Sequence, residues 1–183
     1  MRRLLVAVAA VVSAGCAGSV NGEVAGLRLS VADSIFWYAL DTSGRVNGVF
    51  LTLADRPRLC EELKANREKA QKTSLSFTLF TLTQSEVLPP QPGDYTVSDV
   101  PETPGNFAYA LFSRSDAACQ PTLSEPSGFG RSGLVKLERI RGEKGGNAAG
   151  TFDVTFGTGD RVTGNFNAEF CDIAVAPARP SCE

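Results

Sequence analysis

Residues 150–171 read GTFDVTFGTGDRVTGNFNAEFC and carry the clearest structural signal in the chain. Apolar and polar residues alternate on both sides of the turn sequence GTGD at 157–160, which is the pattern of two half-buried strands. The pieces GTFDVTF and GNFNAEF are alike, and we interpret them as two strands of one hairpin with similar packing requirements rather than as a domain duplication. We therefore expect one hairpin with strands over 149–156 and 161–170.

The same period of two residues recurs outward from this hairpin along most of the chain. Residues 74–83 alternate, but both of their faces carry apolar side chains, which favours a central strand. Together with regular turn signals, about nine short strands predict a mainly β fold, an antiparallel β-sandwich or β-barrel. A length of 183 residues suits a single domain. The remaining expected strands cover 20–31, 35–40, 49–53, 95–97, 106–113 and 134–140.

Residues 56–70 are the one good helix candidate. Pro57 suits a first helical turn, and Asp55 before it is a plausible N-cap. Cys60 shares its side of this helix with Leu59, so we expect it to face the body of the domain. The helix is expected to close one end of the β domain or to cover one edge of it.

The cysteines are five in number, which is an odd count. If Cys16 is modified and forms no disulfide, four cysteines remain, namely Cys60, Cys119, Cys171 and Cys182. Four cysteines allow three disulfide pairings. We favour Cys60–Cys171 and Cys119–Cys182, because these would join the helix to the end of the last strand and the long 113–131 connection to the tail. A bond between Cys171 and Cys182 stays open as an alternative.

The N-terminus looks like an export signal. Two arginines precede an apolar run over 4–12, and small residues follow. The run is too short to span a bilayer, which takes about 20 residues. The sequence Ser13-Ala14-Gly15-Cys16 resembles the lipobox of bacterial lipoproteins, although Ser13 stands where Leu is usual. The resemblance implies cleavage before Cys16, acylation of that cysteine and, with Ala17 after it, an outer-membrane location. The alternative is an ordinary secretory signal cut after Ala17, which would give a secreted or periplasmic protein.

This interpretation divides the chain into four parts. Residues 1–15 are the expected signal peptide, and 16–21 are a lipidated N-terminus with a short tether. Residues 22–173 form the expected β domain, and 174–183 are a tail rich in proline and alanine, fastened by Cys182.

Several chemistries lack the residues that they need. The chain has no histidine, so a Ser-His-Asp or Cys-His catalytic arrangement is impossible. No CxxC pair exists, and we expect neither a metal nor a cofactor. A formal net charge of −2 argues against nucleic acid as a partner. We interpret the acids Glu61 and Glu62 as a solvated helix start, and Asp160 as a turn residue rather than a calcium ligand.

The strongest aromatic cluster is Ile35-Phe36-Trp37-Tyr38. In a strand, Phe36 and Tyr38 point to one side and Ile35 and Trp37 to the other. One pair is expected in the core. The other pair packs in a second layer or forms an exposed platform for a sugar or a protein, and we name Phe36 and Tyr38 as the candidate binding surface.

The mature chain also resembles, loosely, uncharacterised lipoproteins of predatory soil bacteria (the myxobacteria). The resemblance depends on Leu59-Cys60 and on the segment 150–171, and it implies no known function. The sequence thus predicts a membrane-anchored envelope lipoprotein with a non-catalytic binding or structural role and a protein or glycan partner. A carbohydrate-binding or inhibitor module is the first alternative, and a carboxylate-dependent hydrolase is the second.

Overall fold

The computed structural model describes residues 17–101, 103–123, 127–173 and 181–182. The expected signal peptide, the lipidation site Cys16 and most of the tail lie outside these residues. No helix within the described ranges is long and apolar enough to cross a membrane.

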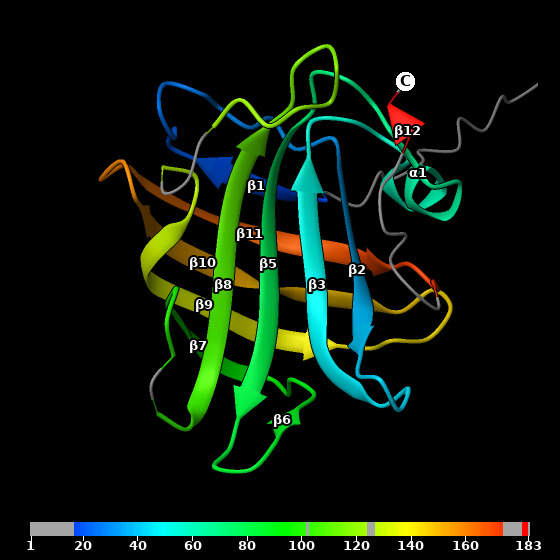
Figure 1. Ribbon diagram of the computed structural model, residues 1–183, viewed down its shortest axis with the longest axis vertical. Helices are drawn as coiled ribbons and strands as arrows, with labels where there is room; N and C mark the ends of the chain where they lie inside the picture. Colours follow the sequence, from blue (N-terminus) through cyan, green and yellow to red (C-terminus); the bar gives the residue numbers. More distant parts are fainter. Residues whose placement is uncertain (1–16, 102, 124–126, 174–180, 183) are drawn as a thin grey trace, which may run out of the picture.

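The domain is a closed β-barrel with one short helix, so the mainly β prediction is confirmed. Figure 1 shows β2, β3, β5 and β8 running lengthwise, with β9, β10 and β11 crossing behind them. Pairing of β11 with β2 closes the circuit. Among the described residues, eight strands form the wall of the barrel, and four further short strands lie beside it. In order around the barrel, the wall strands are β2 (Asp33–Leu40), β3 (Val46–Ala54), β5 (Thr73–Leu82), β8 (Gly105–Arg114), β7 (Gly93–Val97), β9 (Gly130–Ile140), β10 (Asn147–Phe156) and β11 (Arg161–Phe170).

Two of the barrel's strand pairs are parallel, namely β7 with β8 and β11 with β2, while the others are antiparallel. The closing pair β11–β2 registers only Glu169 with Ile35 and Phe170 with Phe36. The barrel is therefore closed at a short seam, and the backbone N–H of Cys171 extends it by donating to the carbonyl of Phe36 at 2.8 Å.

The N-terminal segment differs from the sequence expectation in two ways. Residues expected to form a tether instead form β1 (Gly18–Asn21), which pairs with Thr163 to Phe166 of β11. The predicted strand over 20–31 does not continue, because Ala25 and Gly26 both take positive φ angles and turn the chain. The turn is closed by paired backbone hydrogen bonds between Val24 and Leu27.

The predicted helix over 56–70 is much shorter in the structure, as α1 (Leu59–Lys64). It begins late because Arg58 is left-handed, and Asp55 is not its N-cap. Instead, Asp33 of β2 accepts a hydrogen bond from the Leu59 N–H at 2.9 Å. The chain then turns at Asn66, also left-handed, into β4. The remaining short strands are β4 (Arg67–Glu68), β6 (Val87–Leu88), which pairs with β5, and β12 (Ser181–Cys182), which runs parallel to β4.

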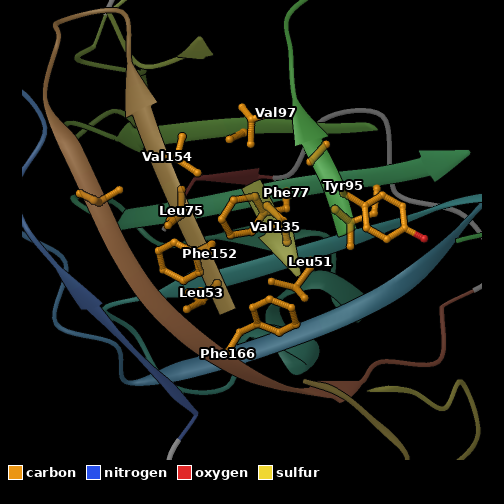
Figure 2. Close-up of a cluster of buried hydrophobic side chains, with 14 of the residues drawn as sticks. Leu51, Leu53, Leu75, Phe77, Tyr95, Val97, Val135, Phe152, Val154 and Phe166 are labelled. Carbon is orange, nitrogen blue, oxygen red and sulfur yellow. The ribbon is translucent and has the colours of Figure 1, made fainter. Parts of the chain in front are cut away.

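Apolar side chains fill the barrel, as Figure 2 shows for Phe77, Phe152 and Phe166. The inward residues of β5 are Leu75, Phe77 and Leu79, all fully buried, and β5 lies between β3 and β8, as expected for a central strand. Burial of such large side chains supplies the main favourable term in folding. Because the interior is packed, sites that can admit a ligand have to be sought on the outside of the barrel.

The terminal hairpin is confirmed, and its register explains why its two strands look alike. Gly150 pairs with Phe166, and Phe152 pairs with Gly164, so each glycine lies opposite the other strand's aromatic ring. A Cβ at Gly150 would lie 1.9 Å from the Lys136 carbonyl oxygen and 2.7 Å from Phe166 Cζ. The G-x-F motif therefore occurs twice because each ring needs a partner without a side chain.

Candidate functional site

The structure joins four cysteines in two disulfides, Cys60–Cys171 and Cys119–Cys182, which are the pairs favoured from the sequence. Cys60 lies on α1 and Cys171 directly after β11, so the first bond fastens the helix beside the barrel seam. Disulfides persist in oxidising surroundings. They place the protein outside the reducing cytoplasm, in an extracellular or periplasmic setting.

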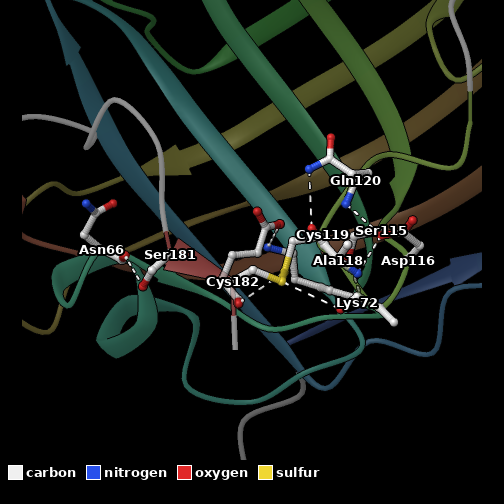
Figure 3. The surroundings of a disulfide bond; sticks show 11 residues. Asn66, Lys72, Ser115, Asp116, Ala118, Cys119, Gln120, Ser181 and Cys182 are labelled. Carbon is white, nitrogen blue, oxygen red and sulfur yellow. Dashed lines mark hydrogen bonds and ion pairs between the residues drawn. A yellow bond between two sulfur atoms is a disulfide. The ribbon is translucent and has the colours of Figure 1, made fainter.

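The second disulfide attaches β12 to the outside of the barrel, as Figure 3 shows. Ser181 N–H donates to the Asn66 carbonyl at 2.9 Å, and β12 pairs with β4. Cys119 Sγ lies 3.5 Å from the Glu68 carbonyl oxygen. The turn from α1 into β4 is thus held from two sides, by the tail and by the 114–122 loop.

Helix α1 packs on the outer surface of β2 through a small apolar cluster separate from the barrel interior. Ile35, Ala54, Leu59 and Cys171 are its buried members, and Trp37 packs partly against it. Alternation along β2 makes this possible, since residues on the outward face of the strand point away from the core. The covered strip continues into an open pocket.

This pocket, called the α1 pocket below, has a volume of about 270 Å³. Its floor is the outer face of β2, β3 and β5, and its wall is α1 with the turn into β4. The volume is below the usual 300–1,000 Å³ of pockets for drug-sized molecules, so it suits a small ligand. The lining residues are Ile35, Trp37, Thr52, Leu59, Glu62, Leu63, Asn66, Arg67, Glu68, Lys72, Ser74 and Ser76.

Two polar atoms of the α1 pocket are buried without a hydrogen-bond partner. One is the indole Nε1–H of Trp37, a donor, and the other is the Oε1 atom of Glu62, an acceptor. Glu62 as a whole is only 8% exposed. Lys69 Nζ lies 3.7 Å from that oxygen, which is an ion pair at a distance too long for a hydrogen bond. Buried polar atoms are nearly always bonded, so a donor and an acceptor without hydrogen bonds mark this pocket as the candidate site.

Hydroxyl groups line the floor of the α1 pocket. Thr52 Oγ1 and Ser76 Oγ lie 3.0 Å apart on neighbouring strands, and one donates to the other. Since each hydroxyl has one proton and two lone pairs, a bonded pair keeps one proton for another acceptor. The ring of Trp37 stacks on Phe50 with a centroid distance of 5.4 Å, which fixes the orientation of the indole.

Charges around the α1 pocket are balanced. Glu62 and Glu68 are its acids, and Arg67 and Lys72 are its bases. Lys72 Nζ binds Glu68 Oε1 at 2.8 Å. A pocket lined by two acids and two bases does not select strongly for a ligand of either charge.

The prediction that Phe36 and Tyr38 form an exposed binding surface is wrong. Phe36 is fully buried inside the barrel, and Tyr38 is partly buried and packs against the same core. The outward residues Ile35 and Trp37 are the ones that line the α1 pocket. Both faces of this tetrapeptide are apolar, so alternation alone could not decide which face points inward.

The interpretation of the helix acids is half right. Glu61 is exposed, as expected, whereas Glu62 is buried and lines the pocket. Glu62 lies three residues after Leu59 and next to Leu63, so its position on the apolar side of the helix was the signal for its burial.

Acids of the last hairpin have structural partners. Asp160 Oδ2 accepts the Ala25 N–H at 2.8 Å, and this hydrogen bond lowers the pKa of Asp160. The Arg161 guanidinium binds Asp153 across the hairpin and lowers the pKa of that carboxyl. Over the described ranges, no three His, Cys, Asp or Glu side chains are grouped so that they could hold a metal ion.

Comparisons with protein-family models, with curated proteins and with solved structures find no match for this chain. The α1 pocket is therefore assigned from its own chemistry, because two of its lining residues, Trp37 and Glu62, each have a buried polar atom without a hydrogen bond.

Proposed function

We propose that the protein is a lipid-anchored, non-catalytic binding protein of the bacterial cell envelope that holds a small ligand in the α1 pocket. One observation carries the binding role. Trp37 and Glu62 line one pocket, and the buried Nε1 of the first and Oε1 of the second have no hydrogen-bond partner. A ligand that bonds to both removes the cost of leaving them without a hydrogen bond, which is about 1–3 kcal/mol for a buried group.

Support for the envelope location comes from the N-terminal sequence and from the disulfides. The lipobox-like sequence ends at Cys16, and β1 begins only two residues later, at Gly18. Acylation of Cys16 would therefore hold the barrel close to the membrane. Two or more acyl chains give stable anchoring.

The binding role is tested by native mass spectrometry of the purified protein, recorded after addition of a concentrated small-molecule extract of the envelopes of the producing cells. Wild type is expected to carry a small adduct, and the Glu62→Gln variant is expected to lose most of it. Glu61→Gln is the matched control, because it removes the same charge from the neighbouring exposed residue. Retention of the adduct by Glu62→Gln would contradict use of the pocket. Recovery of a cleaved ligand from wild type alone would indicate a hydrolase.

Anchoring is tested separately by the intact mass of protein extracted from membranes. We expect the mass of the chain from Cys16 with its acyl groups, and release of a Cys16→Ser variant into the soluble fraction. An unmodified N-terminus at Gly18 would refute the anchor and leave the binding role unaffected.

A further inference from the structure

The α1 pocket combines polar and apolar features that together specify a class of ligand. We infer that the pocket binds an uncharged, hydroxyl-rich small molecule of the size of one sugar ring. This inference rests on the proposed binding role and names the ligand class for the same pocket. It follows from three properties of the lining, which are the polar atoms without a hydrogen bond, the apolar wall and the charge balance.

The two polar atoms without a hydrogen bond require a ligand with both kinds of hydrogen-bonding atom. Trp37 Nε1 needs an acceptor, and Glu62 Oε1 needs a donor. A hydroxyl group provides both, and a sugar ring carries several hydroxyls in a fixed arrangement. The hydroxyl pair of Thr52 and Ser76, at 3.0 Å on the floor, retains one proton for a further acceptor on the ligand.

The apolar wall requires carbon-bound hydrogen on one side of the ligand. Ile35, Leu59 and Leu63 line the pocket beside the indole of Trp37. A pyranose places its ring C–H groups together, so one molecule can use the apolar wall and the polar atoms at once. A fully apolar ligand would leave Glu62 Oε1 unbonded in a buried place, which carries the desolvation penalty described above.

The charge balance argues against an ionic ligand. Glu68 is paired with Lys72 at 2.8 Å, and Lys69 lies 3.7 Å from Glu62. A carboxylate or ammonium on the ligand would have to compete with these pairs after losing its own hydration. The pocket therefore favours a neutral sugar over an acidic one.

Trp37 provides the assay, since it is the only tryptophan in the chain and lines the pocket. Its emission is recorded while methyl glucoside, methyl galactoside or methyl N-acetylglucosaminide is added. Matched probes are cyclohexylmethanol, which keeps a six-membered ring with one hydroxyl, and methyl glucuronide, which adds a carboxylate. A ligand with so few atoms is expected to bind with a Kd of about 1–10 mM.

At least one neutral glycoside is expected to change the emission saturably and to bind about tenfold or more tightly than either matched probe. Glu62→Gln is expected to weaken binding about tenfold, and Glu61→Gln to leave it unchanged, because a hydrogen bond to a charged group is stronger than one to an amide. Trp37→Phe, measured by calorimetry, keeps the ring and removes the N–H, and it is expected to weaken binding about threefold to tenfold.

The outcomes separate this inference from the proposed function. If cyclohexylmethanol bound as tightly as the neutral glycosides, or methyl glucuronide bound more tightly, the assignment to a neutral sugar would be overturned. An adduct that depends on Glu62 would in that case still support the proposed binding role. No response to any glycoside at about 50 mM would overturn the assignment as well. Loss of both the adduct and all responses would refute the binding role itself. Far-ultraviolet circular dichroism of each variant shows whether a loss of binding is a loss of fold.

Discussion

Replacing Gly150 by alanine should destabilise the barrel more than any comparable change in the hairpin. A Cβ at this position would lie 1.9 Å from the Lys136 carbonyl oxygen and 2.7 Å from Phe166 Cζ. The carbonyl belongs to β9, which pairs with β10 on one side and β7 on the other, so it is held from both sides. A register shift between Ala149 and Gly150 brings the two backbones this close.

The magnitude follows from these contacts. Overpacking a well-packed interior costs typically 1–3 kcal/mol, and the clash with a fixed backbone atom puts Gly150→Ala at the upper end. Alanine also reduces the entropy of the unfolded chain, which offsets about 0.4–1 kcal/mol. We therefore expect a net loss of about 2 kcal/mol, or a fall in Tm of about 4–8 °C for a domain of this size.

Two control variants make the reasoning specific. At Gly164 a Cβ would lie 2.0 Å from the Ser19 carbonyl oxygen, but β1 pairs only with β11 and can move outward. Gly164→Ala should therefore cost less than Gly150→Ala. At Gly105 a Cβ would make ordinary contacts of 3.4 Å with the Phe107 ring, so Gly105→Ala should be near neutral.

The assay is urea denaturation followed by the emission of Trp37, with circular dichroism as a second probe. A Gly150→Ala variant within about 0.5 kcal/mol of wild type would refute the reasoning. So would a Gly164→Ala variant that loses more than Gly150→Ala, since the order follows from which neighbouring strand is free to move.

Replacing both Cys119 and Cys182 by serine should lower the free energy of unfolding by up to about 4 kcal/mol, because their disulfide closes a loop of 63 residues. Urea denaturation measures the loss, and an unchanged unfolding midpoint would contradict the prediction. The pKa of Asp153 is lowered in the folded state by its hydrogen bond from Arg161, so its contribution to stability is present above the ordinary value of 3.8 and is lost as the pH falls below it. The free energy of unfolding should therefore be higher for wild type than for Asp153→Asn at pH 7, and the difference should shrink as the pH falls. A difference that stays constant from pH 7 to about pH 3 in urea denaturation would argue against a contribution from ionised Asp153.

The sequence was informative where one face of a strand differs from the other or where turn residues mark an end. The terminal hairpin and the strand over 74–83 were located for these reasons, and the structure places them within one or two residues. Closure of the barrel was not predictable in the same way. It depends on two registered residue pairs between β11 and β2, which are strands far apart in sequence.

The candidate site was predicted poorly, for two physical reasons. Alternation shows that Phe36 and Trp37 point to opposite sides, but the side that meets the core is decided by β3 and β11. The late start and the early end of α1 depend on Arg58 and Asn66 adopting left-handed conformations, which neither residue type requires. Glu62 lies on the apolar side of this short helix, so its burial could have been predicted from its position, whereas its ion pair with Lys69 could not.

The two disulfides interleave along the chain, since Cys119 lies between Cys60 and Cys171 while Cys182 follows both. A chain exported with its N-terminus first, as proposed, presents Cys60 and Cys119 to the oxidising compartment before either native partner has emerged. Once Cys16 is acylated, the first bond available is the non-native Cys60–Cys119 bond, and thiol–disulfide exchange is needed to resolve it. Maturation of this barrel should accordingly depend on a disulfide isomerase in addition to an oxidant.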